Sequence, residues 1–162
     1  METKLDQNRA VKKFLFTLLL LTLANLSAAT TLNAACSVTA GPVSFGVYDP
    51  LSLSPLDTIG RLTYRCEGRD HNISIGISRG NAPSFNPRQL RMGAETLNYN
   101  LFVDVARTAI WGDATGGTTT LFVRNPQPNN SDIQVNIFGR IAAQQSTAAG
   151  TYNDTLTVTI NF

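Results

Sequence analysis

The chain has 162 residues, 43% of them hydrophobic and 15% charged, and a formal net charge of +2 at pH 7. This length is enough for one domain with a single hydrophobic core. Because basic and acidic residues nearly balance, the chain lacks the positive field that would hold nucleic acid or an anionic membrane. We therefore expect no nucleic-acid partner.

The N-terminal segment has the order of features that is typical of a secretory signal peptide. Lys12 and Lys13 precede an apolar run at residues 14–23, and small residues follow at 27–29. The apolar run is about half of the roughly 20 residues that span a bilayer. The pattern therefore predicts export, with no membrane span in the mature chain.

Cleavage after Ala29 satisfies the preference for small residues at the cut site. It divides the chain into a signal peptide, residues 1–29, and a single domain, residues 30–162. The signal peptide holds four basic and two acidic residues, so the remaining domain has nine of each and is neutral. Cuts after Ala24 or Ala35 stay open as alternatives.

Cys36 and Cys66 are the two cysteines of the chain. In an exported protein the default expectation for such a pair is a disulfide, here between the first and second strands. Closing a loop of about 31 residues would stabilise the fold by roughly 3.5 to 4 kcal/mol on the chain-entropy model. A metal site or a catalytic thiol lacks a second ligand cluster or a nearby base. Lipidation of Cys36 is the weaker alternative, because Leu32 lies one position too far from it.

Apolar residues alternate with polar ones in several short segments of the mature chain, which predicts strands. Turn-forming residues separate these segments, and no stretch has the pattern of an amphipathic helix. The pattern predicts an all-β antiparallel sandwich. The expected strands are residues 37–47, interrupted near Gly41-Pro42, and then 61–66, 72–77, 97–103, 121–123, 133–141 and 151–162.

The last segment has the strongest alternation in the chain. Leu156, Val158, Ile160 and Phe162 share one face, and the pattern continues to the final residue. Seven residues of this kind would span roughly 23 Å as a main strand. A strand edge left unpaired is a template for a strand of another chain. The sequence therefore predicts a protein that associates.

The sequence contains no recognisable catalytic or cofactor motif. His71 is the single histidine, so a histidine-rich metal site is ruled out and a serine-histidine-aspartate triad would depend on that one ring. Asp49 and Asp57 have the composition of turns rather than of a glycosidase pair. Neither phosphate-binding glycine motif is present. We expect no enzyme activity, no catalytic residue, no cofactor and no metal.

A series of short motifs extends over residues 36–162. The motifs are CSVTA at 36–40, FGVYDP at 45–50, RLTYRC at 61–66, RM at 91–92, LNYNLF at 97–102, WGD at 111–113, FGRI at 138–141 and GTYNDT at 150–155. In this order they resemble the spore coat protein U domain family, which includes subunits of archaic, Csu-type chaperone-usher pili. The family usually has a glycine where this chain has Ala114, so the turn at that position is the point of departure.

The resemblance implies an immunoglobulin-like sandwich that lacks its last strand. A groove along the final strand then exposes the core until a partner strand enters it. A periplasmic chaperone would fill the groove first, and the N-terminal extension of the next subunit would replace it at an outer-membrane usher. The residues that border the groove would be Leu156, Val158, Ile160 and Phe162.

The donor segment depends on the cleavage site. A cut after Ala29 leaves six residues ahead of Cys36, which is short for a donor strand and suits a minor, tip or initiating subunit. A cut after Ala24 would retain an alternating segment that could enter a neighbour. The candidate donor residues are Leu26, Ala28, Thr30, Leu32 and Ala34.

The expected function is that of a structural pilus subunit, secreted through the periplasm to the cell surface or to a pilus. One alternative is a tip adhesin that binds a surface or a glycan through loops around Trp111, Tyr48 and Phe85. Exposed aromatic side chains would favour that alternative, and buried ones would favour the structural function. The other alternative is a secreted coat or envelope protein that forms no fibre.

Overall fold

A computed structural model describes residues 35–67, 72–124 and 131–162. The expected signal peptide, the candidate donor residues and His71 lie outside these ranges. The described residues form eight strands and no helix. The strands are β1 (Ala35–Ala40), β2 (Leu56–Glu67), β3 (Asn72–Ile77), β4 (Arg88–Met92), β5 (Glu95–Phe102), β6 (Leu121–Arg124), β7 (Ile133–Ile141) and β8 (Val158–Asn161).

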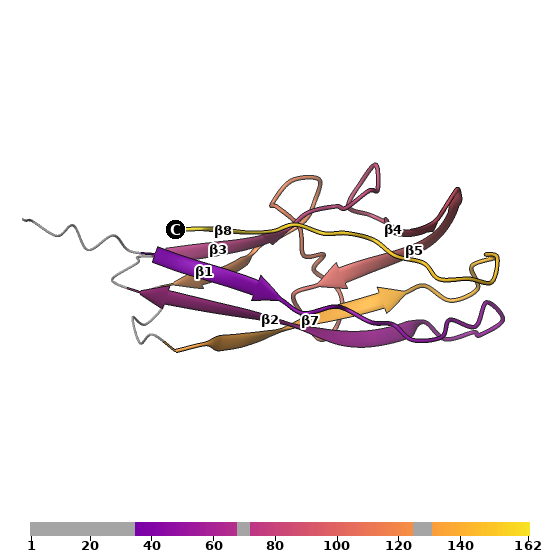
Figure 1. Ribbon diagram of the computed structural model, residues 1–162, viewed down its shortest axis with the longest axis horizontal. Coiled ribbons are helices and arrows are strands. Elements are labelled where there is room, and N and C mark those ends of the chain that lie inside the picture. Colours follow the sequence, from indigo (N-terminus) through magenta and orange to yellow (C-terminus); the bar gives the residue numbers. More distant parts are fainter. Residues whose placement is uncertain (1–34, 68–71, 125–130) are drawn as a thin grey trace, which may run out of the picture. The chain divides into compact units, whose positions relative to one another are not determined.

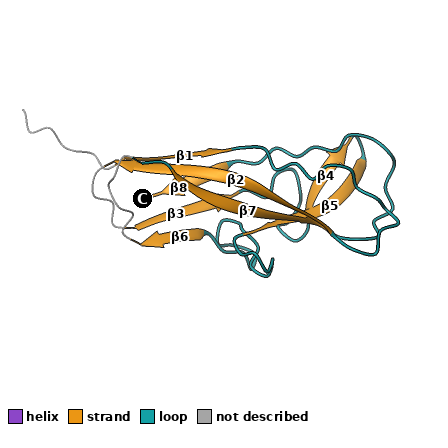
Figure 2. Cartoon of the chain, turned by 90° about the horizontal axis from the view of Figure 1, so that it is seen from below, coloured by secondary structure: helices purple, strands orange, loops and turns teal. Residues whose placement is uncertain are grey.

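The strands form two sheets that face each other across one core (Figures 1 and 2). One sheet has the order β1-β2-β7-β5-β4 and the other β6-β3-β8, and every neighbouring pair is antiparallel. Inward residues of both sheets pack together, among them Leu62, Ile75, Leu101 and Ile137. The predicted all-β antiparallel sandwich is confirmed.

Cys36 and Cys66 form a disulfide and lie directly opposite each other in the antiparallel pair of β1 and β2. The bond therefore fixes β1 at the edge of the five-stranded sheet.

The sequence predicted β3 and β7 with the bounds that the structure has, but it misplaced other strand ends. The first strand ends at Ala40 instead of continuing to residue 47, because Pro42 has no amide to donate to a ladder. β2 begins at Leu56 rather than at Arg61. The sequence does not indicate the first five residues of β2, because Gly60 interrupts the apolar alternation.

The predicted last strand, residues 151–162, is wrong over most of its length, because only Val158–Asn161 pairs as a strand. The segment before it crosses from one sheet to the other. Asn153 exchanges two backbone hydrogen bonds with Arg91 of β4, at 2.8 and 3.0 Å. Thr157 then accepts one from Ser78, just after β3, at 2.8 Å. Phe162 lies beyond β8 and is 62% exposed.

β4 was not among the strands predicted from the sequence, and its first residue is a buried arginine. Arg88 is completely buried and donates to the carbonyls of Ser78 and Trp111 at 3.0 and 2.6 Å. It also donates to Oδ1 of Asn100 at 2.8 Å and to the carbonyl of Ile77 at 3.1 Å. Burial lowers the pKa of Arg88. One guanidinium thus joins β4, β5 and the end of β3.

Ala114 occupies a turn position that suits glycine. Its φ is +71°, in the left-handed region where a Cβ is unfavourable. Asp113 Oδ1 accepts the backbone N–H of Thr115 at 2.9 Å and helps to hold this turn. The turn therefore keeps the geometry of a glycine although the residue is alanine.

We expect Ala114→Gly to raise the free energy of unfolding by about 0.5 to 1 kcal/mol, because relief of the left-handed strain exceeds the added chain entropy. Ala149 is also exposed but is not a positive-φ residue. Ala149→Gly is the matched control and should be neutral or destabilising. Urea unfolding of both variants measures the difference, and a loss of stability in Ala114→Gly would contradict the strain.

Candidate functional site

The candidate site lies between the two sheet edges formed by β1 and β8. Each of these strands pairs with one neighbour only, β1 with β2 and β8 with β3. The two strands are in contact, but within the described residues no ladder joins them. Beyond the end of β1 the edges separate around an apolar hollow of about 250 Å³. The sandwich is therefore open along this seam.

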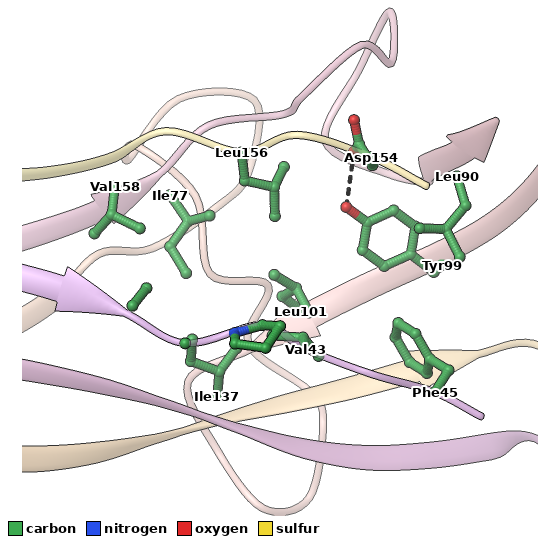
Figure 3. A pocket seen from close by; sticks show the side chains of 13 residues that line it. Val43, Phe45, Ile77, Leu90, Tyr99, Leu101, Ile137, Asp154, Leu156 and Val158 are labelled. Atoms are coloured by element: carbon green, nitrogen blue, oxygen red, sulfur yellow. Dashed lines mark hydrogen bonds between the residues drawn. The ribbon is translucent and has the colours of Figure 1, made fainter. Parts of the chain in front are cut away.

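Figure 3 shows the hollow from close by. Val43 and Phe45 line one side, Leu156 and Val158 line the other, and Ile137 lies at the base with further core residues. Of all the lining residues, only Tyr99 and Asp154 carry a polar side-chain group. An apolar hollow at an unpaired edge is suited to the side chains of an added strand.

Two glycines allow the first side of the hollow to lie close to the sheet. A Cβ on Gly60 of β2 would come within 2.6 Å of Val43 Cγ2. A Cβ on Gly139 of β7 would come within 2.9 Å of the Phe45 ring. Phe45 also makes an edge-to-face contact with Tyr99, with ring centroids 5.8 Å apart. The segment after β1 is thus packed in place although it is not a strand.

The second side of the hollow is only partly covered. Leu156, Val158 and Ile160 are half-buried and alternate with exposed threonines. The adjacent strand β3 provides the comparison, because its inward isoleucines are at most 1% exposed. The inner face of the last segment therefore lacks the cover that the rest of the core has.

The four residues predicted to border a groove have different positions. Leu156 and Val158 line the hollow, and Ile160 lies in β8 outside the lining. Leu156 and Phe162 flank β8, because the backbone pairing runs only from Val158 to Asn161. That the four residues border an acceptor groove stays a prediction. The opposite side of the hollow has no signal in the sequence, because the residues that leave room for its side chains are glycines on distant strands.

The polar end of the hollow is built by Asp154. Its Oδ2 accepts the Tyr99 hydroxyl at 2.8 Å, and its Oδ1 accepts the backbone N–H groups of Asn81 and Thr155 at 3.2 and 2.9 Å. Burial and this hydrogen bond raise the pKa of Tyr99 far above its ordinary value, so the phenol stays neutral. Gly80 has a φ of +65°, and a Cβ there would collide with the Asp154 carboxylate. This end is therefore rigid and polar.

The carboxylates considered as catalytic candidates have structural partners. Arg140 donates to both oxygens of Asp57 at 2.7 and 2.8 Å, and these bonds lower the pKa of Asp57. Arg107 lies 3.4 Å from the same carboxylate. Asp49 Oδ1 accepts the Leu51 backbone N–H at 2.9 Å in a turn. Neither carboxylate lines the hollow.

Within the described residues, no group of three or more histidine, cysteine, aspartate or glutamate residues is arranged to hold a metal ion. No helix in that part of the chain is long and apolar enough to cross a membrane.

Comparison with known proteins identifies the family. The model of the spore coat protein U domain matches residues 22–159, which is most of the chain. The chain belongs to the spore coat protein U domain family. This spore coat U domain protein is also 31% identical to "Protein U" of Myxococcus xanthus over 156 residues, covering 86% of this chain and 84% of that protein.

A solved structure gives the second comparison. The spore coat U domain protein is similar to a chain in the complex of CsuC and CsuE, a chaperone and a tip adhesion subunit before assembly, from archaic chaperone-usher Csu pili of Acinetobacter baumannii. The TM-score is 0.54 at 25% sequence identity, and the match covers 80% of this chain. The matched part is 40% of the other chain's length.

These comparisons define the class of the spore coat U domain protein. Its sandwich is of the immunoglobulin-like type found in the Csu pilus subunit. The family and the matched fold are those of structural proteins, so the chain is not an enzyme.

Proposed function

We propose that this protein is a structural subunit of a secreted surface fibre and is assembled by donor-strand complementation. The observation that carries the proposal is the seam between β1 and β8, where two unpaired edges flank an apolar hollow. An added strand would hydrogen-bond along β8 and place alternate side chains into the hollow. The family membership and the likeness to a pilus subunit support the same function.

The edges of β1 and β8 are in contact before any strand enters, so an occupant has to part them. No backbone ladder between the two strands is lost when this happens. The half-buried Leu156, Val158 and Ile160 gain cover, and burial of apolar surface drives the step at about 25 cal/mol per Å². Opening is therefore offset by the contacts of the new strand.

The proposal includes the route and the partners. Residues 1–29 would direct export to the periplasm, where a chaperone supplies the first strand. At an outer-membrane usher, the N-terminal extension of the next subunit would replace it. The donor residues would be Leu26, Ala28, Thr30, Leu32 and Ala34.

The aromatic residues considered for a tip adhesin are buried or half-buried, and each makes contacts within the domain. Trp111 is completely buried, and its Nε1 donates to the Ile75 carbonyl at 2.8 Å. Phe85 is buried beneath the Arg88 guanidinium. Tyr48 is half-buried, and its hydroxyl donates to the Ala142 carbonyl at 3.1 Å. These contacts favour the structural function over adhesion through the three aromatics.

A pair of substitutions on β8 tests the proposed function. Val158 faces the hollow and Thr159 faces solvent, so Val158→Asp and Thr159→Asp place the same charge on opposite faces of one strand. We expect Val158→Asp to reduce assembly about 100-fold, because a charge in an apolar groove costs roughly 3 kcal/mol. Thr159→Asp should assemble normally.

The measurement is the amount of oligomer that resists SDS until boiled, recovered from the native host exporting each variant. Normal assembly of Val158→Asp would contradict donor-strand complementation at this seam. If the unsubstituted protein reaches the surface without oligomers, it is a coat protein that forms no fibre.

A further inference from the structure

The loop between β1 and β2 exposes three large apolar side chains within seven residues. Val47, Leu51 and Leu53 are 93%, 85% and 82% exposed. Asp49 is the one charged residue between positions 47 and 53, and its carboxylate holds the Leu51 backbone N–H. The backbone N–H of Ser52 donates to the Asp49 carbonyl at 3.2 Å. The loop thus holds apolar side chains in water, where they contribute nothing to the fold of one domain.

This loop lies at the end of the domain opposite to the start of β1. Figures 1 and 2 show it with the other turns at one end, while β1 begins at the end where the C-terminus lies. The register agrees, because Ala35 pairs with Glu67 and the loop leads into Leu56 at the other end of β2. Phe162, at the end opposite to the loop, is 62% exposed. The loop end therefore exposes three apolar side chains, and the opposite end exposes the Phe162 side chain.

The direction of β8 decides which end faces the molecule that supplies a strand. β8 runs from the loop end toward the end where β1 begins. An occupant that pairs antiparallel with β8, the slightly more stable arrangement, runs toward the loop end. Its carboxyl end leaves the groove there. If the occupant precedes β1 in its own chain, the domain that follows it must lie against the loop.

We infer that the loop of Val47, Leu51 and Leu53 docks against the next copy of this chain, at the end that carries Phe162. This inference rests on the proposed function, because the inserted strand sets the direction. The two surfaces are different, so the contact is heterologous and repeats along an open filament. Burying the three side chains between copies accounts for their exposure in a single domain.

Engineered disulfides between copies test this contact. The native cysteines are bonded to each other, so new thiols react without competition from them. The variant Leu51→Cys with Phe162→Cys places one thiol at each end. We expect a covalent ladder after mild oxidation, still present after boiling in SDS without reductant and lost on reduction. Leu51→Cys alone and Phe162→Cys alone should give no ladder.

The matched control moves the first thiol to the side of the domain. Ile59 is exposed in the middle of β2, opposite Phe138 of β7. Ile59→Cys with Phe162→Cys should give no ladder above the level of the single variants. The unboiled, reduced sample reports independently whether donor-strand oligomers have formed.

The outcomes separate the two proposals. Oligomers that form without the covalent ladder would overturn the end-to-end contact and leave donor-strand assembly intact. A dimer from Leu51→Cys alone would overturn it as well, because it would place like ends together. Absence of any oligomer in the unboiled sample would overturn both.

Discussion

Replacing Arg88 by methionine is expected to lower the free energy of unfolding by about 3 to 5 kcal/mol. The guanidinium serves four acceptors, three of them backbone carbonyls and the fourth Oδ1 of Asn100. Methionine fills much of the volume but donates nothing, so these buried acceptors lose their partner. Removing the cation also removes the free-energy cost of desolvating it, and this offsets part of the loss. The same desolvation lowers the pKa of Arg88.

Arg91 on the same strand provides the control for Arg88. It is exposed, and its side chain donates to the Asn81 carbonyl at 3.2 Å. Arg91→Met should change the free energy of unfolding by less than about 1 kcal/mol. Arg88→Lys should lie between the two, because an ammonium keeps the charge but cannot match the planar fork of donors. A loss below 1 kcal/mol for Arg88→Met in urea unfolding would refute the structural role of the network.

A strand bound in the groove is expected to stabilise the domain strongly. A synthetic peptide of residues 25–34, the candidate donor segment, serves as the probe. At a concentration 100 times its Kd, binding adds about 2.7 kcal/mol, which corresponds to a rise in Tm of roughly 10 °C for a domain of this size. The same peptide with Leu32→Asp should raise the Tm far less, because it places a carboxylate where an apolar side chain enters.

The Val158→Asp domain links this effect to the groove. The unaltered peptide should leave the Tm of that variant unchanged, while it should stabilise the Thr159→Asp domain normally. Equal stabilisation of both variants would mean that the peptide binds elsewhere.

Much of the fold follows from local pattern. The segments 72–77 and 133–137 alternate without interruption, and the strands that contain them run over 72–77 and 133–141, as predicted. The alternation at 151–162 is just as clear, but only part of it pairs, since Asn153 bonds to one sheet and β8 to the other. Periodicity thus indicates an extended backbone and an inward face, but it does not say which sheet the backbone joins.

The parts of the site that the sequence does not indicate depend on contacts between distant residues. Gly60 and Gly139 determine where Val43 and Phe45 can lie, and neither glycine stands out from the turn glycines in the sequence. Tyr99 and Asp154 are 55 positions apart and meet only once β5 and the last segment are in place. These relations are tertiary, so a local pattern cannot report them.

Amide hydrogen exchange of the domain with and without the donor peptide tests the central claim most directly. If β1 and β8 are open edges, amides of Val158–Asn161 that point away from β3 exchange quickly in the free domain. With the peptide bound they should slow by about 100-fold or more, as new ladder bonds form. Fast exchange that persists at saturating peptide, or full protection of these amides before any peptide is added, would contradict an edge that takes its partner strand from another molecule.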